Sequence, residues 1–484
     1  MKAKSLIENS IWGASGELIV RLIKFIQLIV IANFLGTEGM GLFNYAIAAA
    51  GLFSIFFDFG ILTVATRENS KRRTPNNLLI YFITKIITSG IGFLLFIGAY
   101  LGGFYITESA DSIVYLVASI LILDISHLIL AYYRAQHNFQ KEAQYRAAII
   151  IIQFIGTVVI LNYSSNLTHL AISLLCINLL SMYPLIIILI TDFKKNISRV
   201  SLIQIKSTLK ECLPFAGIAL VGALYTSLDV LILGHYLDIS LVGIYTIAMK
   251  FILGFMIIPI VFIQNAQIPA MASSLKNMSF DLEDIKQWQQ GFFKIIFIGL
   301  AIGIFFAAMS DLIIDFTFGE NFKDSSKWLT YLTIVGLCYY IYTPFITYLI
   351  VTGNAKLVFY VQLTASLLNL LLLLLLVPQY GIIGAVISSI ITHTIIGLLI
   401  IAITLRIKPN LLPMKQMINL LKYFLSFVVV ILSMFFLDGE MDSSIVVIKL
   451  TIGFVFFVVF YKESTDLIMD IYKFVFKKSD IDVN

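Results

Sequence analysis

Long apolar runs recur along the whole chain, and short polar segments separate each run from the next. A helix needs about 20 apolar residues to cross the hydrocarbon core of a membrane, and most runs reach that length. The runs lie near residues 11–35, 41–66, 78–104, 113–133, 146–161, 168–191, 212–234, 242–264, 290–309, 328–351, 357–377, 382–405, 417–437 and 444–461. The pattern predicts an all-α polytopic membrane protein with about 14 transmembrane helices.

The composition agrees with this prediction. Hydrophobic residues make up 60% of the chain and charged residues only 13%, whereas about a quarter of a soluble domain is charged. This composition argues against a soluble binding module and against nucleic-acid binding. We find no metal-ligand spacing, phosphate-binding glycine loop or nucleophile motif, so we expect no metal, no cofactor and no enzyme activity. Cys176, Cys212 and Cys338 lie in apolar runs, and we expect them to be buried without disulfides.

The charge of the loops predicts the orientation of the chain in the membrane. Alternate loops are basic and contain Arg67, Lys71, Arg72 and Arg73; Arg134 and Lys141; Lys194, Lys195, Arg199, Lys206 and Lys210; and Arg406, Lys408 and Lys415. The intervening loops are nearly free of basic residues, with Lys323 and Lys327 as exceptions. Because basic loops stay in the cytoplasm, both termini of this multi-pass protein are predicted to be cytoplasmic. No cleavable signal peptide is expected at the N-terminus.

A short internal repeat divides the chain. Leu35–Ala46 resembles Leu237–Ala248, and Gly41 aligns with Gly243 when the two segments are superposed. Both segments follow the first span of a six-span block, so the repeat is parallel and favours two lobes around a central cavity. The predicted parts are an N-terminal six-helix lobe (1–195), a cytoplasmic linker (196–211), a C-terminal six-helix lobe (212–405), and two further helices with a cytoplasmic tail (406–484).

The first apolar run carries three charged residues, Glu17, Arg21 and Lys24. Spacings of four and three residues place them on one face of a helix. Measured from the turn at residues 36–39, Lys24 lies roughly 16 Å and Arg21 roughly 21 Å below one surface of the membrane. A charge at this depth costs about 2.5–3.5 kcal/mol. Two features could offset that cost. One is a structural Glu17–Arg21 ion pair, and the other is a water-filled cationic cavity that receives an anionic substrate.

Other basic residues lie within apolar runs. Lys250 lies in the eighth run, at a depth close to that of Lys24, and belongs to the opposite lobe. It is predicted either to face Lys24 across the cavity and bind the substrate anion, or to pair with Asp229 in the seventh run. Lys85 is a further candidate for the cationic cavity, although it and Lys449 could instead extend to water at the membrane surface.

Acidic residues within the runs are candidates for ion coupling or for a gate. Asp124 and His127 lie one turn apart in the fourth run and, with Glu17, could couple transport to H+ or Na+. A satisfied polar pair inside the lobe is the alternative. Asp58 lies near the end of the second run, where it is expected to cap a helix or pair with Arg67 at a gate rather than bind an ion.

Three segments resemble a known family of transporters. The segment LGTEGMGLFNYAIAAAGLFSIFFDFGILTVATRE resembles the second-span signature of polysaccharide flippases. LPFAGIALVGALYTSLDVLILGHYLDISLVGIYTIAMK resembles the opening of their second lobe, and LLNLLLLLLLVPQYGIIGAVISS their eleventh-to-twelfth hairpin. The chain thereby resembles the Wzx-type flippases of O-antigen and capsule repeat units, within the multidrug/oligosaccharidyl-lipid/polysaccharide (MOP) exporter superfamily.

This resemblance implies a MATE-like protein of the bacterial inner membrane with two six-helix lobes and two extra helices. It implies a flippase that moves an undecaprenyl-pyrophosphate oligosaccharide to the outer leaflet by alternating access, driven by an H+ or Na+ gradient or by the membrane potential. It also implies a polysaccharide polymerase and a chain-length regulator as partners. Arg21, Lys24 and Lys250 lie in spans comparable to those in which the lipid II flippase of this superfamily uses basic residues.

Three alternatives remain. A lipid II flippase would use the same anion chemistry. A drug or cation antiporter of the same fold would need an acidic cavity, whereas the excess charge here is basic. A membrane-embedded polymerase or ligase would need a large outer loop with catalytic Arg or His residues, and the chain has none.

Overall fold

The structure is a computed structural model that describes residues 3–72, 78–103, 110–195, 201–263 and 282–435, together with 448–449, 451–453 and 455–456. Within these ranges the chain is almost entirely helical and contains no strand, which confirms the predicted all-α class. The start of the predicted linker and most of the fourteenth predicted span lie outside the described residues. The chain forms two compact units, Met1–Gly243 and Ile244–Asn484, which are described separately.

Twelve of the described helices are long and apolar enough to cross a membrane. The first of these stretches, Gly16–Asp58, has 43 residues and lies in α1 (Ala3–Asp58). At about 1.5 Å per residue it extends roughly 65 Å, about twice the thickness of the hydrocarbon core. Gly36 divides it, because its φ of 66° falls in the left-handed region that favours glycine. This one helix therefore accounts for the first two predicted spans, and the other eleven match predicted spans three to thirteen.

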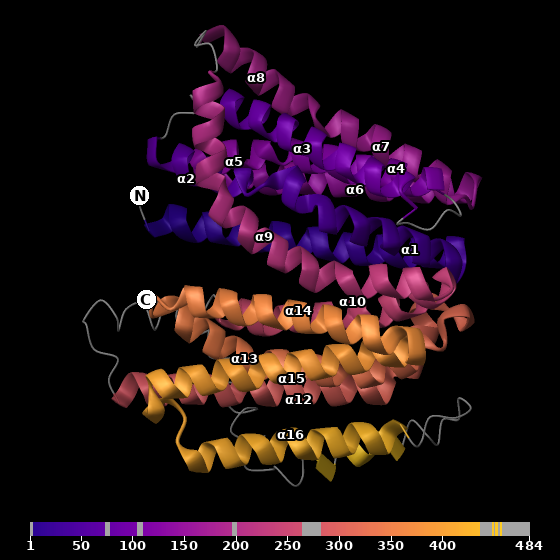
Figure 1. Cartoon of the computed structure of the whole chain (residues 1–484), viewed down its shortest axis with the longest axis vertical. Coiled ribbons are helices and arrows are strands. Elements are labelled where there is room, and N and C mark those ends of the chain that lie inside the picture. The colour runs from indigo at the N-terminus through magenta and orange to yellow at the C-terminus, as the bar shows by residue number, and fades with distance from the viewer. Residues whose placement is uncertain are drawn as a thin grey trace, which may run out of the picture. The chain divides into compact units, whose positions relative to one another are not determined.

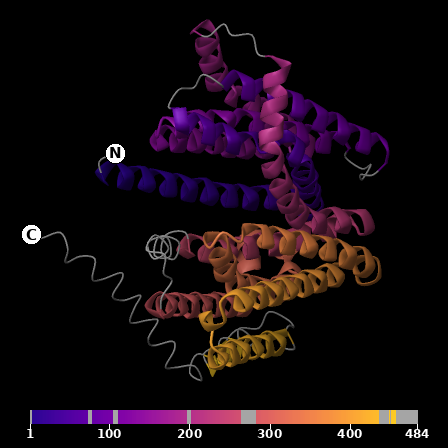
Figure 2. The same ribbon diagram turned by 60° about the vertical axis from the view of Figure 1, so that its left-hand side comes forward.

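Most long helices of the first unit run roughly alongside one another, whereas α9 crosses them (Figures 1 and 2). After α1 they are α2 (Ile61–Arg72), α3 (Leu78–Leu101), α4 (Ala110–Ser126), α5 (Leu128–Ala135), α6 (Phe139–Tyr163), α7 (Leu167–Ser181), α8 (Tyr183–Lys195) and α9 (Leu202–Tyr236), and α10 (Ile239–Phe262) begins here. α9 therefore packs with the first unit, although the sequence assigned residues 212–234 to the second lobe. The internal repeat assigns α9 to the second lobe, and this assignment stays a prediction.

The two copies of the internal repeat contact each other within the first unit. A Cβ added to Gly41 would collide with the carbonyl oxygen of Ile239, and a Cβ added to Gly243 would collide with that of Thr37. Thr37 aligns with Ile239 in the same superposition that aligns Gly41 with Gly243. The contact is therefore reciprocal, as in a two-fold interface, and this observation supports the repeat found in the sequence.

Two helix breaks in the first unit position charged side chains. The chain leaves α1 at Asp58 and enters α2 through Phe59 and Gly60, which have positive φ values of 48° and 75°. The backbone N–H of Leu62 then donates to Asp58 Oδ1 at 3.2 Å and caps α2. The second break lies at His127, which separates α4 from α5.

The second unit is built around one strongly buried helix, α13 (Ser325–Val351). Its other helices are α12 (Leu282–Phe318), η2 (Glu320–Phe322), α14 (Ala355–Tyr380), η3 (Pro409–Leu411), α15 (Ile382–Ile407) and α16 (Met414–Phe435). α12 and α15 pack against α13, and α16 packs against both α12 and α13 (Figure 1). Gly299 of α12 allows close packing, because an added Cβ would lie 2.6 Å from the Tyr340 ring.

Candidate functional site

The charged face of α1 meets α6 in the first unit. Arg21 Nε donates to Glu17 Oε1 at 2.8 Å, and Arg146 Nη1 of α6 donates to Glu17 Oε2 at 2.9 Å. Gly16 brings the two helices together, because an added Cβ would lie 2.7 Å from Ala143 Cβ. The predicted Glu17–Arg21 pair thus exists, and it is extended by an arginine from a second helix.

The network continues from Arg146 toward the start of α6. Arg146 Nη2 lies 3.3 Å from Glu142 Oε1, and Arg134 at the end of α5 binds the same carboxylate with its Nη2 at 2.7 Å. Lys24 is exposed on α1, one turn beyond Arg21. We call these six residues the basic cluster: Glu17, Arg21, Lys24, Arg134, Glu142 and Arg146. Four positive and two negative side chains give the cluster a net charge of about +2 at neutral pH.

Exposure changes along the basic cluster. The side chains of Arg21 and Glu17 are 49% and 42% exposed, those of Arg146 and Glu142 only 28% and 10%. Arg146 and Glu142 were not predicted as site residues. Their spacing of four residues is typical of an ion pair on a helix. However, the pair lies at the edge of the fifth apolar run, where charged residues are common. The arrangement suits an anion that approaches Arg21 and Lys24 from outside the helix packing.

A second group of charges lies where the two helix breaks meet α3. Lys85 Nζ donates to Asp58 Oδ1 at 2.7 Å and lies 2.9 Å from Asp124 Oδ2. We call Asp58, Lys85 and Asp124 the acidic cluster, because two carboxylates and one ammonium group leave an excess of one negative charge. The Lys85 side chain is fully buried, and about a quarter of each carboxylate side chain is exposed.

This geometry bears on the expectations for Lys85, Asp58 and Asp124. Lys85 does not extend to water, because two carboxylates hold its ammonium group inside the helix packing. Asp58 caps α2, which is one of its two expected roles, but its ion pair is with Lys85, whereas Arg67 lies 2.9 Å from Glu68 and 3.5 Å from Glu211. Asp124 likewise pairs with a lysine of another helix, while His127 interrupts its own helix. The contact of Lys85 with substrate stays a prediction. So does the role of Asp58, Asp124 and His127 in coupling or gating.

Two predicted residues, Lys250 and Asp229, belong to different units. Lys250 is half-buried on α10, and Asp229 is buried on α9 of the first unit. Because they belong to different units, the proposed facing of Lys24 by Lys250 and the alternative Lys250–Asp229 pair both stay predictions. Lys449 was expected to extend to water, but it is fully buried and its Nζ donates to Asp311 Oδ2 at 3.1 Å.

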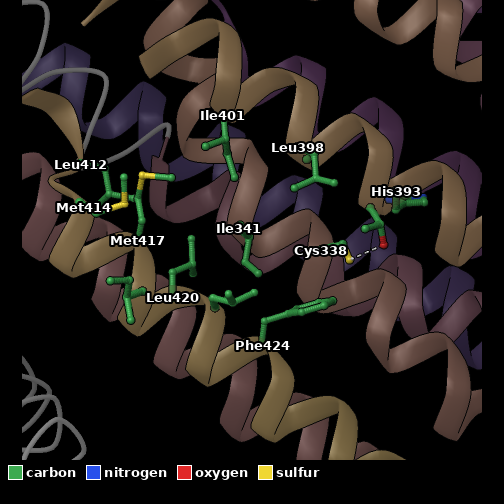
Figure 3. A pocket seen from close by; sticks show the side chains of 14 residues that line it. Cys338, Ile341, His393, Leu398, Ile401, Leu412, Met414, Met417, Leu420 and Phe424 are labelled. Carbon is green, nitrogen blue, oxygen red and sulfur yellow. Dashed lines mark hydrogen bonds between the residues drawn. The ribbon is translucent and has the colours of Figure 1, made fainter. Parts of the chain in front are cut away.

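A pocket of about 310 Å³ opens between α13, α15 and α16 of the second unit (Figure 3). Its lining includes Ile341, Leu398, Ile401, Met417, Leu420 and Phe424. Few polar groups reach it; Cys338 Sγ and Thr394 Oγ1 lie 3.8 Å apart, and His393 Nδ1 is 3.1 Å from the Tyr342 hydroxyl. Such a lining suits hydrocarbon and not a charged group. No cluster of metal ligands occurs among the residues that the structure describes.

The chain is similar to proteins of polysaccharide biosynthesis. A family model described as polysaccharide biosynthesis protein matches residues 6–275, more than half of the chain. The chain is 21% identical to the capsular polysaccharide biosynthesis protein CapF of Staphylococcus aureus, over 79% of this chain and 95% of CapF.

Two solved structures have a similar fold. The lipid II flippase MurJ in its inward closed conformation matches with a TM-score of 0.71 and 18% identity, over 95% of this chain and 99% of MurJ. A multidrug resistance MATE family transporter of the MOP superfamily, in its inward-facing conformation, matches with a TM-score of 0.64 and 12% identity, over 81% and 95% of the two chains. The predicted MATE-like fold is therefore confirmed.

Proposed function

Because this chain belongs to the polysaccharide biosynthesis protein family, we propose that it flips undecaprenyl-pyrophosphate-linked oligosaccharide repeat units across the bacterial inner membrane. The direction is from the cytoplasmic to the outer leaflet, for O-antigen or capsule synthesis. The name of CapF and the MurJ-like fold support this proposal. The observation that carries it is the basic cluster, which has an excess of positive charge and includes the exposed residues Arg21 and Lys24.

The chemistry of the substrate matches the basic cluster. A pyrophosphate carries at least two negative charges and many acceptor oxygens, so it binds guanidinium forks and ammonium groups. Lys250 adds a further positive charge from the second unit in this proposal. Alternating access then carries the charged group across the membrane, while the isoprenoid chain stays in hydrocarbon.

The acidic cluster is the proposed coupling site. Its excess negative charge suits one H+ or one Na+, and low local dielectric makes a neutral cluster more stable than a charged one. His127 lies at the break beside Asp124, and Glu17 is the acidic residue of the basic cluster that was predicted to join the coupling. Coupling to the membrane potential alone is the alternative.

We propose that transport involves no catalytic step. The protein is proposed to lie in the bacterial inner membrane with both termini in the cytoplasm. A polysaccharide polymerase and a chain-length regulator are the proposed protein partners, because they would act on the flipped repeat unit. Reporter fusions to each terminus test the orientation, since a cytoplasmic reporter is active only on that side.

A lipid II flippase is the second candidate, and the MurJ-like fold favours it specifically. Both candidates share the pyrophosphate anion and differ in the attached sugar. A drug or cation antiporter fits less well, because cationic substrates would be repelled by the net positive charge of the basic cluster.

The test is the lipid-linked sugar pool of cells depleted of this protein. We expect undecaprenyl-pyrophosphate oligosaccharides to accumulate on the cytoplasmic face while surface glycan disappears. Accumulation of lipid II would support the second candidate instead. Unchanged pools with increased sensitivity to cationic dyes would contradict both and favour the antiporter.

A further inference from the structure

Glu17 is held as a bound anion would be held. Each of its two carboxylate oxygens accepts from a different arginine: Oε1 from Arg21 Nε at 2.8 Å and Oε2 from Arg146 Nη1 at 2.9 Å. The two arginines come from different helices, α1 and α6. Two oxygens of one phosphate present acceptors of the same kind to guanidinium groups. Glu17 therefore occupies the place between the arginines where a phosphate would bind.

The Glu17 carboxylate is weakly held compared with Glu142. Its side chain is 42% exposed, and exposed ion pairs contribute little because water and side-chain entropy oppose them. The Glu142 side chain is only 10% exposed, and Arg134 binds its Oε1 through both Nε and Nη2. An incoming anion can thus displace Glu17, whereas Glu142 stays in place and orients Arg146.

The arginines keep unused capacity to bind oxygen atoms. Arg146 Nε is buried and makes no hydrogen bond with any residue that the structure describes. A buried N–H without an acceptor is costly, so this donor favours a ligand with more oxygens than a carboxylate. Lys24 lies exposed one turn beyond Arg21. The close packing of Gly16 on Ala143 fixes the spacing of α1 and α6, so the site is formed before a ligand arrives.

We propose that Glu17 is an internal competing anion, and that the phosphate groups of the substrate displace it to bind Arg21 and Arg146 together. This inference rests on the proposed function and deepens it. A phosphate monoester already carries about 1.5 to 2 negative charges at neutral pH, so it also competes with the single charge of the carboxylate. A pyrophosphate brings more charge and more oxygens and binds the arginines more strongly, whereas the internal anion lowers the affinity of every competing anion by the same factor.

The test measures lipid binding to the full-length protein in nanodiscs of neutral phosphatidylcholine, by thermophoresis. The probes are geranylgeranyl pyrophosphate and geranylgeranyl phosphate. If Glu17 occupies the site about nine-tenths of the time, Glu17→Gln tightens pyrophosphate binding about tenfold. Monophosphate binding tightens by the same factor, because Glu17 blocks the same arginines for both probes, so the ratio of the two affinities stays unchanged. Arg146→Gln weakens binding, and added to Glu17→Gln it removes most of the gain.

Glu142→Gln is the matched control, because it removes the same charge from the same network without touching Arg21. We expect it to tighten binding much less than Glu17→Gln. If both variants tighten binding equally, the change in net charge alone explains the gain in affinity, and the inference is overturned. Unchanged or weaker binding by Glu17→Gln would also overturn it, while binding by the unmodified protein would leave the proposed function standing.

Two further outcomes separate the inference from the proposed function and from folding. If neither the unmodified protein nor any variant binds the pyrophosphate, both the inference and the proposed function fail. Glu17→Asp keeps the charge but shortens the side chain, so it spans the two arginines poorly and should tighten binding by an intermediate factor. Loss of folded protein in both Glu17 variants, measured by thermal unfolding, would make Glu17 a structural residue and overturn the inference.

Discussion

The first unit contains two clusters of charged side chains, and they differ in both exposure and net charge. The basic cluster has an excess of positive charge, and its outer members Arg21 and Glu17 are 49% and 42% exposed. The acidic cluster has an excess of negative charge and is centred on Lys85, which is fully buried. Each contains at least one ion pair between helices that are distant in sequence, Glu17–Arg146 in the first and Lys85–Asp124 in the second.

This difference supports different proposed roles for similar chemical groups. An exposed excess of cations can receive an anion without unfolding its surroundings, so the basic cluster suits a substrate. A buried excess of one negative charge is costly until a proton or a small cation neutralises it, so the acidic cluster suits coupling and folding. Substitutions in the first cluster should therefore affect transport, and those in the second should also affect stability.

The largest effect is expected for Lys85→Ala. It leaves two carboxylates close together without their buried partner, and breaking such a pair costs about 3–5 kcal/mol. We expect a large fall in the thermal unfolding temperature and in the amount of protein in the membrane. Export of glycan should fail as a consequence.

A neutral replacement provides the control for Lys85. The triple variant Lys85→Met, Asp58→Asn, Asp124→Asn removes all three charges at similar volume. Replacing a buried ion pair by neutral groups is often close to neutral for stability, so most of the lost unfolding temperature should return. If Lys85→Ala alone unfolds at the normal temperature, the cluster does not stabilise the fold and the comparison fails.

The next largest effect is the loss of transport in Arg21→Ala or Lys24→Ala. Each removes one positive charge from the exposed side of the basic cluster, and we expect glycan export to fall to the level of depleted cells. Stability should change by less than about 1 kcal/mol, because exposed ion pairs contribute little. Surface glycan and protein level, measured together, test this prediction.

Lys141→Ala is the matched control for the basic cluster. Lys141 is exposed near the start of α6 but is not a member of the cluster. Its loss removes the same charge from the same unit, and export should continue. Normal export by both Arg21→Ala and Lys24→Ala would contradict the assignment of the cluster to the substrate.

A smaller effect is expected for Asp124→Asn. The change removes the excess negative charge and leaves Asp58 to pair with Lys85. The fold should persist, while transport in proteoliposomes should lose its response to an imposed H+ or Na+ gradient. Retained gradient dependence would exclude the acidic cluster as the coupling site.

Much of the fold was predictable because the membrane imposes one strong rule. Backbone groups in hydrocarbon must bond within a helix, so the length of each apolar run predicts a span. The first thirteen spans were confirmed in this way. The boundary between the compact units was not predicted, because apolar length says nothing about which neighbours a helix such as α9 contacts.

The candidate site was only partly predictable, for the same reason. Spacing along α1 placed Glu17 and Arg21 on one face, and this pair is present. The partner of Lys85 depends on two helix breaks that bring Asp58 and Asp124 to α3, and periodicity within one helix carries no information on such contacts. The role of Arg146 was missed because a charge at the end of an apolar run is usually a surface residue.

The smallest effect on transport is expected at Gly41, where packing changes and charge does not. Gly41→Ala places a methyl group against the carbonyl of Ile239, and overpacking of this kind costs about 1–3 kcal/mol. Gly243→Ala should cost a similar amount, because the two glycines make reciprocal contacts. Gly222→Ala on α9 is the control, since an added Cβ there meets no atom within 4 Å.

These glycine variants sharpen the comparison of the two clusters, because they lower stability and leave every charge in place. If Gly41→Ala lowers the unfolding temperature while the surviving folded protein still exports glycan, lost export in Arg21→Ala follows from charge and not from weakened packing. If instead Gly41→Ala abolishes export without loss of stability, the reciprocal contact itself takes part in transport. The internal repeat would then be a functional element as well as a structural one.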